Sequence, residues 1–406
     1  MNVLVMNPGG NSLKVELVSC SPAQQFAFEG SKLVSVTVEG IGKEDPRLSV
    51  FEGKKVTHSE AIDAKDYGAA ASNTLSWLEE NKHVQHSDID CVGLRVVHGG
   101  RHFTVATPVT GEVEQQIRAY ERLAPLHNKS SIELLEPIRS RLGRVPLYAV
   151  FDTAFHRTIP DVASLYAIPT ALAEKHGIRR FGFHGTSHRY LLERAAYLLG
   201  KSPQDVNLVT MHLESGCSAT AIASGKSIDN TMGFTPLEGL MMGTRSGDVD
   251  PSILPFLIRE EHMDMDEAMA LLNKKSGLLG ISEKSLDTRV LMRDYGKDPR
   301  VTLALNMFSY RLVKAVGASL CVLGGADAIV FGGGIGENTP LVRERVGAGL
   351  HWCGLQLDPE KNRSLTEGEG KLSGENSALE ALVVVTEEGL QIAHECSQTL
   401  IALSPS

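Results

Sequence analysis

Long hydrophobic runs are missing from this sequence, and so is an excess of positive charge. No apolar run approaches the roughly 18–20 residues that a membrane-spanning helix needs. Met1 is followed by a strand-like run in place of the basic and apolar regions of a signal peptide. A net charge of −9 argues against binding to nucleic acid or to an anionic membrane surface. The sequence therefore predicts a cytoplasmic protein with neither nucleic acid nor membrane as a partner.

Motifs of several common protein classes are also missing. The six cysteines are scattered and form no CxxC pair, which fits a reducing compartment and leaves no zinc framework. The sequence has no Walker A motif, so the chain is not a P-loop enzyme. It also has neither a GxSxG elbow nor an HExxH zinc motif. What remains is a chain of 406 residues, which is long enough for more than one domain.

Two similar hairpins are predicted far apart in the chain. Residues 3–19 (VLVMN, PGGNS, LKVELVS) and residues 207–224 (NLVTMHL, ESGCS, ATAIAS) each consist of two apolar strands joined by a short Gly/Ser turn. Backbone N–H groups at such a turn can hold phosphate oxygens. The repeat suggests a duplicated architecture in which one hairpin opens each half, and two unrelated hairpins are the alternative.

Strands and helices alternate in the rest of the chain, which predicts the α/β class. Residues 145–152 (VPLYAVFD) predict a buried strand that ends on Asp152. Residues 69–81 and 266–273 have the apolar spacing of helices, and residues 387–400 predict a last helix. No low-complexity linker divides the chain, which favours closely joined domains.

Two glycine-rich segments suit an anionic ligand. Residues 229–251 (DNTMGFTPLEGLMMGTRSGDVDP) include Arg245, whose planar guanidinium can donate two parallel hydrogen bonds to a carboxylate or phosphoryl group. Residues 327–346 (DAIVFGGGIGENTPLVRERV) predict a strand, a glycine loop and a helix, with Thr339 as N-cap and Pro340 at the first helical position. Such a loop can present N–H groups to an anion or a nucleotide. A solvated surface loop is the alternative for the first segment.

Four further segments combine charge, histidine and glycine at expected strand ends or loops. They are GLRVVHGG (93–100), LAPLHN (123–128), VFDTAFH (150–156) and FGFHGTSH (181–188). Taken singly, each histidine could be an ordinary core residue, and each Arg or Asp a structural ion pair or turn cap. Taken together, arginines and imidazoles can neutralise the oxygens of a transferring phosphoryl group, and carboxylates can hold Mg²⁺.

Together with NKKSGLLGIS (273–282) and GGIGEN (333–338), these segments resemble the acetate kinase family, of the acetate and sugar kinase, Hsp70 and actin superfamily. The resemblance runs from Asn7 to the C-terminal helix and so covers essentially the whole chain. It implies an α/β fold of two domains with duplicated ribonuclease H-like cores, an active site in the cleft between them, and a homodimer.

The resemblance also implies where the domains divide. An N-terminal actin-like domain is expected at residues 1–151, joined by the C-terminal helix at residues 388–406. An actin-like nucleotide-binding domain is expected at residues 152–387.

Catalytic roles are implied residue by residue. Arg95 and Arg245 resemble the arginines that bind the carboxylate and the transferring phosphoryl group. His184 resembles the histidine that stabilises that phosphoryl group in the transition state. Asp152 resembles an essential carboxylate near the nucleophile and the metal, and His127 a second active-site histidine.

The other implied site residues surround the substrates. Asn7 and Glu388 match the residues that position Mg²⁺. The apolar pocket for the methyl group of acetate is implied for Val97, Leu126, Phe183 and Pro236. Contacts to the nucleotide are implied for Ser12, Lys14, His212, Gly216, Asp287, Arg289, Gly332, Gly333, Gly334, Gly336 and Asn338.

The reaction implied by the family is a direct in-line phosphoryl transfer. A carboxylate oxygen of acetate attacks the γ-phosphorus of ATP and gives acetyl phosphate and ADP. Because a carboxylate is already ionised at neutral pH, the enzyme need not deprotonate its nucleophile. Charge neutralisation and alignment carry the catalysis. A small carboxylate and ATP or ADP are the expected substrates, and Mg²⁺ is the expected cofactor.

Departures from the family's usual pattern fall mainly in the loops expected to contact phosphate. Gly10 and Asn11 stand where two serines are usual, and Ser215 where asparagine is usual. Glu214 and Glu283 each replace a glycine. A carboxylate about 4 Å from a phosphate oxygen is repelled by roughly 4 kcal/mol at an effective dielectric near 20. Glu214 therefore either points to solvent without effect, or weakens the use of ATP and favours another donor such as pyrophosphate.

Other interpretations stay open. A propionate or short-chain acyl kinase is a near neighbour, because one methylene in an apolar pocket is worth only about 1–3 kcal/mol. A catalytically degraded, ligand-binding homologue would explain the altered hairpins but not the retained arginines, histidine and carboxylates. A sugar kinase or an Hsp70-like chaperone is more distant, since no sugar-binding insertion or peptide-binding domain is evident.

Overall fold

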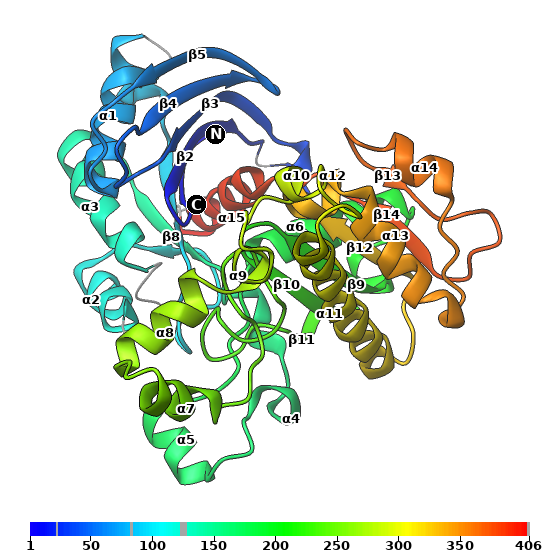
Figure 1. Ribbon diagram of the computed structural model, residues 1–406. Coiled ribbons are helices and arrows are strands. Elements are labelled where there is room, and N and C mark those ends of the chain that lie inside the picture. Colours follow the sequence, from blue (N-terminus) through cyan, green and yellow to red (C-terminus); the bar gives the residue numbers. More distant parts are fainter. Residues whose placement is uncertain (22, 82–83, 122–127, 404–406) are drawn as a thin grey trace. The chain divides into compact units, whose positions relative to one another are not determined.

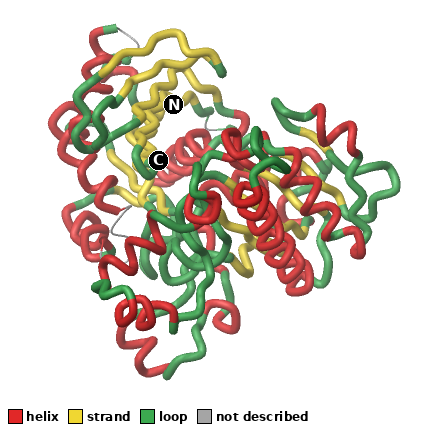
Figure 2. The backbone as a smooth tube through the Cα atoms, viewed as in Figure 1, coloured by secondary structure: helices red, strands yellow, loops and turns green. Residues whose placement is uncertain are grey.

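The computed structural model describes residues 1–21, 23–81, 84–121 and 128–403. The chain forms two compact units. Unit 1 consists of Met1–Arg157, Gly185–Tyr190 and Glu387–Ser406, and unit 2 of Thr158–His184 and Leu191–Thr386. Each unit contains a β-sheet with helices packed on it (Figures 1 and 2). Within the described ranges, no helix is both long enough and apolar enough to cross a membrane.

The sheet of unit 1 has eight strands in the order β5-β4-β3-β2-β1-β6-β8-β7. β1 pairs antiparallel with β2, as the first predicted hairpin requires, and parallel with β6, which in turn is parallel to β8. The strands are β1 (Asn2–Pro8), β2 (Ser12–Ser19), β3 (Ser31–Glu39), β4 (Arg47–Glu52), β5 (Lys55–Ala61), β6 (Cys91–Val96), β7 (Thr107–Pro108) and β8 (Leu147–Phe151).

Burial along these strands follows their place in the sheet. The central strand β1 is buried along nearly its whole length, as expected for a strand inside a sheet with both faces covered. The outer strand β3 alternates between buried and more exposed residues, because an antiparallel strand can face water on one side. The predicted strand at 145–152 is confirmed as β8, and Asp152 follows its last residue.

The described part of unit 1 contains four α-helices and the first part of a fifth. The predicted helix at 69–81 is confirmed as α1 (Tyr67–Glu80), whose N-cap Asp66 accepts a hydrogen bond from the Ala69 amide. α1 packs against α3, and the C-terminal helix α15 packs against β1 and β6. The other helices are α2 (Gly111–Ala119), α3 (Asn128–Leu142), the start of α6 (Gly185–Leu198) and α15 (Glu388–Leu403).

The sheet of unit 2 repeats the strand arrangement of unit 1. Its order is β11-β10-β9-β12-β14-β13, and β9 pairs antiparallel with β10 and parallel with β12. In both sheets the opening hairpin is followed by two parallel strands on the far side of the first strand, which confirms the predicted duplication. The strands are β9 (Asn207–Leu213), β10 (Cys217–Ala223), β11 (Lys226–Asn230), β12 (Ala328–Gly332), β13 (Gly370–Lys371) and β14 (Glu380–Val383).

The longest helix of unit 2 is α11 (Pro299–Leu323), which packs against β10. Its first turn is capped by Asp298, which accepts hydrogen bonds from two backbone amides, and it ends at Gly324 in the left-handed conformation. The others are α4 (Asp161–Ser164), α5 (Thr170–His176), the rest of α6, α7 (Ile253–Glu260), α8 (Met265–Lys274), α9 (Gly277–Ser282), α10 (Thr288–Leu291), α12 (Gly333–Asn338), α13 (Pro340–Gly349) and α14 (Pro359–Ser364).

One local prediction was wrong. The expected glycine loop after β12 is the short helix α12, so residues 333–338 are helical. Thr339 is the N-cap residue of α13, as predicted, but its side chain forms no capping hydrogen bond and lies 3.4 Å from the Thr288 hydroxyl. Pro340 does begin α13, as predicted. The glycines obscured the helical pattern because glycine has a low intrinsic helix propensity.

Candidate active site

In unit 1, a buried ion pair forms at the carboxyl ends of two neighbouring strands. Arg95 lies near the end of β6 and Asp152 follows β8, and the two strands are parallel. Arg95 donates from Nε to Asp152 Oδ1 (2.9 Å) and from Nη2 to Asp152 Oδ2 (2.6 Å). The Asp152 side chain is 1% exposed and that of Arg95 is 11% exposed. This two-pronged geometry fixes the plane of the guanidinium.

The same guanidinium is connected to the two predicted metal-positioning residues. Arg95 Nη1 donates to Asn7 Oδ1 (3.1 Å) and to the Pro8 carbonyl (3.3 Å). Asn7 Nδ2 donates to Glu388 Oε2 (2.9 Å) at the start of α15. Four residues that are far apart in sequence thus form one chain of hydrogen bonds, from Asp152 through Arg95 and Asn7 to Glu388.

The first turn of α6 supports Asp152. The Gly185 amide donates to the Asp152 carbonyl (2.9 Å), and the Thr186 hydroxyl lies 3.5 Å from Asp152 Oδ1. A Cβ atom on Gly185 would lie 2.1 Å from the Asp152 carbonyl oxygen, so no larger residue fits there. The FGFHGTSH segment therefore holds Asp152 through its glycine and threonine.

In unit 2, His184 has a conformation that is unusual for a residue with a side chain. It is the N-cap of α6 and has φ +58°, in the left-handed region. Its Nδ1 atom is 2.9 Å from the Ser218 hydroxyl on β10, and its ring centroid is 4.3 Å from that of His212 on β9. Strained, well-supported residues of this kind are found preferentially at functional sites.

Gly216, in the turn between β9 and β10, leaves room beside His184 and Arg245. A Cβ atom built on Gly216 would lie 3.2 Å from His184 Nε2 and 3.6 Å from Arg245 Nη1. Arg245 Nη1 also donates to the Pro236 carbonyl (3.0 Å), within the same 229–251 loop. Burial lowers the pKa of the Arg245 guanidinium, which stays cationic at neutral pH. An imidazole nitrogen and a partly desolvated guanidinium thus approach one point, which suits a phosphoryl group.

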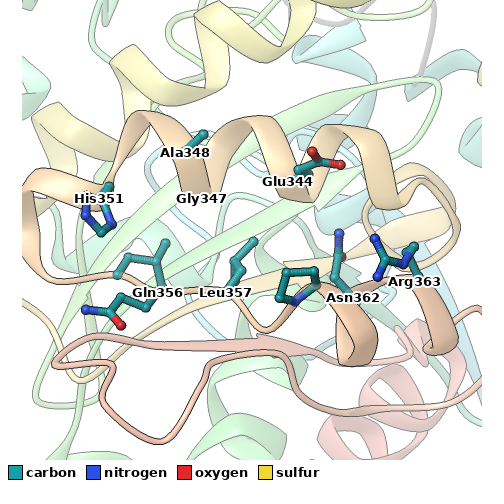
Figure 3. Close-up of a pocket in the computed structure, with 10 residues that line it drawn as sticks. Glu344, Gly347, Ala348, His351, Gln356, Leu357, Asn362 and Arg363 are labelled. Carbon is teal, nitrogen blue, oxygen red and sulfur yellow. The ribbon is translucent and has the colours of Figure 1, made fainter.

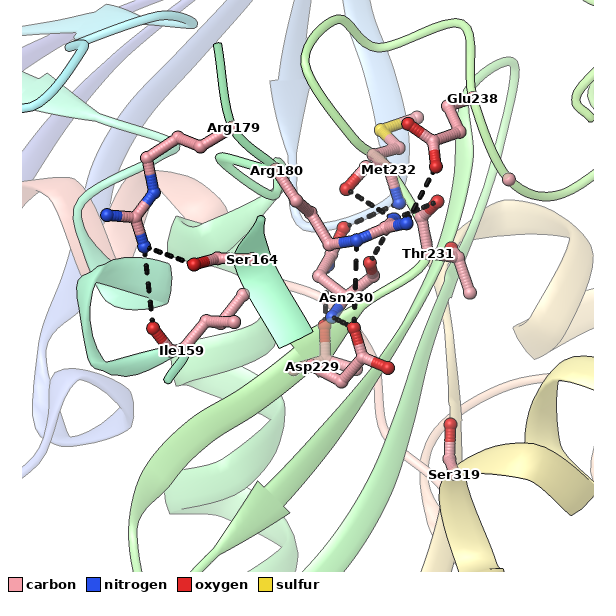
Figure 4. Close-up of polar contacts among 12 residues, drawn as sticks. Ile159, Ser164, Arg179, Arg180, Asp229, Asn230, Thr231, Met232, Glu238 and Ser319 are labelled. Atoms are coloured by element: carbon pink, nitrogen blue, oxygen red, sulfur yellow. Dashed lines mark hydrogen bonds and ion pairs between the residues drawn. The ribbon is translucent and has the colours of Figure 1, made fainter. Parts of the chain in front are cut away.

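Arg180 organises this loop and was missed in the sequence. Its Nη1 donates to the carbonyls of Asn230 (2.9 Å) and Thr231 (3.1 Å), and its Nη2 donates to Glu238 (2.6 Å). Figure 4 shows the guanidinium pointing into this set of acceptors. Asn230 also bonds to the backbone of Phe183. Arg180 therefore ties the loop that carries Arg245 to the segment before His184, and the adjacent arginines 179 and 180 were the available sequence signal.

Several of the residues predicted to contact the nucleotide lie at two short helices. Asp287 is the N-cap of α10 and forms an ion pair with Arg289 (2.8 Å), whose side chain is 82% exposed. The contact between Thr288 and Thr339 brings α10 to the end of α12. Within α12, the Gly333 amide donates to the Thr386 hydroxyl (2.8 Å) and the Asn338 side chain to the Gly334 carbonyl. Gly332 is the N-cap of α12, and Gly336 is buried.

Glu214 lies against this glycine segment. Its side chain is exposed, yet a Cβ atom on Gly333 would lie 2.9 Å from Glu214 Cγ. Burial and the neighbouring charge of Glu214 raise the pKa of Glu337, which accepts a hydrogen bond from the Thr386 amide. Two carboxylates thus stand close to a segment predicted to contact nucleotide.

Glu283 is the second residue that replaces a glycine usual in the family. It is the C-cap residue of α9 and has φ +52°, in the left-handed region. Its carboxylate forms an exposed ion pair with Arg300. Left-handed backbone costs an L-residue roughly 1–2 kcal/mol, whereas exposed ion pairs are worth about 0–1 kcal/mol. We expect Glu283→Gly to raise the melting temperature by about 1–3 °C in calorimetry.

Glu283→Ala is the matched control, because it removes the ion pair and keeps the left-handed strain. It should be no more stable than the unsubstituted protein. If Glu283→Gly melted lower than Glu283→Ala, the backbone strain at this position would not be the dominant effect.

The remaining predicted residues are placed as follows. Lys14 lies opposite Asn7 in the β1–β2 hairpin, and Ser12 begins β2. Val97 is 7% exposed, and Phe183 is fully buried. His127 and Leu126 lie outside the described residues, so their predicted roles stay untested.

One cavity of unit 2 lies away from all these residues. It has a volume of about 540 Å³ and lies between α13 and residues 355–363. Figure 3 shows side chains such as Glu344 and Arg363 around it. None of the predicted site residues lines it. The candidate site is identified instead by two clusters of side chains, one around Arg95 and Asp152 in unit 1 and one around His184 and Arg245 in unit 2.

Comparisons with known proteins identify the family of this chain. The family model described as the acetokinase family matches residues 2–394. The acetate kinase of Chloroherpeton thalassium is 41% identical over 408 residues, covering 97% of this chain and 98% of that protein. The crystal structure of Porphyromonas gingivalis acetate kinase is 37% identical with a TM-score of 0.88, covering 98% of this chain and 99% of that one.

A propionate kinase structure from Francisella tularensis is nearly as similar. It is 36% identical, has a TM-score of 0.88, and covers 97% of this chain and 98% of its own. The two solved structures thus match the fold of this chain equally well, and one is an acetate kinase and the other a propionate kinase. Matched by the family model over nearly its whole length, this chain belongs to the acetokinase family.

Proposed function

We propose that the protein is an acetate kinase, which reversibly transfers a phosphoryl group between ATP and acetate to give acetyl phosphate and ADP. The observation that carries the proposal is family membership over residues 2–394, together with both clusters of side chains that this chemistry needs. The direct test is formation of acetyl phosphate from acetate, ATP and Mg²⁺.

The proposed roles follow from the charges of the side chains. Arg95, held in one plane by Asp152, binds the carboxylate of acetate. His184 and Arg245 neutralise the charge on the transferring phosphoryl group. Asp152 keeps Arg95 in position and partly compensates its buried charge. No general base is required, because acetate is already ionised at neutral pH. Alignment and charge stabilisation therefore supply the catalysis.

The donor chemistry at the predicted metal position fits Mg²⁺. Asn7 and Glu388 carry oxygen donors, and Mg²⁺ prefers oxygen ligands while keeping several waters and substrate phosphates. Asn7 donates to Glu388 and so orients that carboxylate. When bound, Mg²⁺ would neutralise charge on the phosphate oxygens.

Propionate is the second candidate substrate, favoured by the likeness to a propionate kinase structure. The proposed methyl pocket includes Val97, which is β-branched and nearly buried. A narrow pocket of this kind favours acetate over longer acyl groups. Comparing kcat/KM for acetate, propionate and butyrate distinguishes the two, and the highest value for butyrate would overturn the preference.

Glu214 gives a prediction about the phosphoryl donor. Its side chain lies against Gly333, where Glu214 Cγ is 2.9 Å from the position of a built Cβ atom, in the segment where we propose the nucleotide phosphates bind. Removing it should lower the KM for ATP by about tenfold or more, since each 1.4 kcal/mol of relieved repulsion is a factor of ten. Steady-state kinetics of Glu214→Gly at saturating acetate and Mg²⁺ measure this.

Glu214→Gln is the control that removes the charge and keeps the size. It should recover most of the gain if repulsion is the cause. An unchanged KM for ATP in both variants would mean that Glu214 is tolerated without effect. Turnover with pyrophosphate and none with ATP would favour the alternative donor.

We also propose a cytoplasmic homodimer. Helix α11 exposes three large apolar side chains, Leu303 (52%), Tyr310 (65%) and Val322 (56%). Exposed apolar side chains are typical of surfaces that bind another protein, which supports association of two copies of the chain. Light scattering coupled to size exclusion gives the mass in solution directly. A monomer at micromolar concentration would contradict the proposed assembly.

A further inference from the structure

Glu16 is a buried carboxylate that the proposed reaction does not use. It lies on β2 with no exposed surface, and its partners Lys14, Lys32, Ser35 and Gly389 belong to unit 1. Its Oε1 atom lies 3.0 Å from Lys32 Nζ, 3.4 Å from Lys14 Nζ and 3.3 Å from the Ser35 hydroxyl. Lys14 is one of the residues that the sequence predicts to contact the nucleotide. A charge this deeply buried is costly, and its two lysine partners compensate that cost.

The other oxygen of Glu16 faces the beginning of α15. Glu16 Oε2 has no hydrogen-bond partner among the described residues. A Cβ atom on Gly389, the second residue of α15, would lie 1.8 Å from it. The carboxylate therefore fills the space that glycine leaves at the first turn of the helix. A negative charge is stabilised there, because the helix dipole is positive at its N-terminus.

Lys32 connects this carboxylate to the residue before Glu388. Besides Glu16, Lys32 forms an ion pair with Glu387. Glu388 follows directly and accepts the hydrogen bond from Asn7. Lys14 lies opposite Asn7 in the β1–β2 hairpin. Contacts from Glu16 thus reach both the start of α15 and the hairpin residue Lys14.

We propose that Glu16 is a positioning residue for the metal end of the site. Its carboxylate holds Lys14 and Lys32 on the sheet and fixes the first turn of α15, and thereby sets the positions of Lys14 and Glu388. Glu16 itself contacts neither substrate nor metal. The inference rests on the proposed function, because it is through Mg²⁺ and nucleotide that the position of Glu388 matters.

The test is binding of ADP as a function of Mg²⁺ concentration, measured by titration calorimetry on the full chain. Glu16→Gln keeps the size of the side chain and removes the charge that holds both lysines. We expect the Mg²⁺ concentration for half-maximal ADP binding to rise at least fivefold. Glu52→Gln, the same change at an exposed position of β4, should leave it unaltered.

A second variant reaches the same carboxylate from the helix. Gly389→Ala places a methyl group on Glu16 Oε2, so it should displace the carboxylate and raise the Mg²⁺ requirement while Glu16 is still present. In a Glu16→Ala background the methyl group has room, and Gly389→Ala should then add little further change. Coupling of this kind is expected for residues in contact and not for independent sites.

The two possible failures are distinguishable. If the unsubstituted protein binds ADP in the presence of Mg²⁺ and makes acetyl phosphate, but folded Glu16→Gln keeps the same Mg²⁺ requirement within twofold, the positioning role is contradicted and the proposed function stands. A lower melting temperature with an unchanged Mg²⁺ requirement would assign Glu16 a purely structural role. Additive effects of Gly389→Ala and Glu16→Ala on the Mg²⁺ requirement would also overturn the inference.

Discussion

Replacing Arg245 with alanine is expected to lower kcat by about 10³-fold or more. Arginines that stabilise the transition state of phosphoryl transfer contribute about 10³–10⁵ in kcat. Arg245 Nη1 and His184 Nε2 approach the same point beside Gly216, and burial of Arg245 strengthens its interaction with a developing charge. Because the loop backbone is held by Arg180, the variant should fold and melt close to the unsubstituted protein.

Two controls accompany this measurement. Arg245→Lys keeps the charge but loses the planar fork, so its kcat should lie between those of the protein and the alanine variant. Arg259→Ala removes an exposed arginine of α7 in the same unit and should leave kcat unchanged. A loss of less than tenfold in Arg245→Ala would contradict the role that we assign to Arg245.

Removing Asp152 should have the largest combined effect on stability and activity. Asp152→Ala leaves the Arg95 guanidinium largely buried without its carboxylate partner. Breaking a buried ion pair in this way costs about 3–5 kcal/mol. For a unit of this size that corresponds to a melting temperature lower by roughly 6–20 °C. Calorimetry measures the shift, and acetyl phosphate formation should fall together with it because Arg95 loses its orientation.

A double variant separates the two effects. Arg95→Met with Asp152→Ala removes both charges and replaces the guanidinium with an apolar side chain. Its stability should recover, because replacing a whole buried ion pair with apolar groups is often neutral. Its activity should stay low, since the acetate-binding arginine is gone. An Asp152→Ala protein that melts within 2 °C of the unsubstituted one, against the expectation of roughly 6–20 °C, would show that the pair is not needed for stability.

Much of the architecture could be predicted because it follows from local pattern. Apolar strands around a Gly/Ser turn gave both hairpins, now β1–β2 and β9–β10. The apolar run before Asp152 gave β8 and placed that carboxylate at a strand end. Arg95 lies near the end of the neighbouring parallel strand, paired with Val150, and its long side chain reaches Asp152. Position at the carboxyl end of a strand was therefore informative about the site.

Other features depend on tertiary contacts that no local pattern carries. The helix at residues 333–338 was expected as a loop, because its glycines have low helix propensity and its stability comes from packing and from contacts such as that of Gly333 with Thr386. The pairing of Glu16 with Gly389 joins residues at opposite ends of the chain, and neither residue type signals the other. Arg180 was unremarkable in sequence because its acceptors are mainly backbone carbonyls of a distant loop.

The most direct test of the proposed function is formation of acetyl phosphate from acetate, ATP and Mg²⁺, trapped as the hydroxamate. We predict Mg²⁺-dependent product with kcat in the range of about 1–10³ s⁻¹ that is usual for enzymes. Product formation should be lost in Arg245→Ala. A folded protein that binds ADP and acetate but forms no hydroxamate with ATP or with pyrophosphate would contradict the proposal and identify the chain as a ligand-binding member of its family.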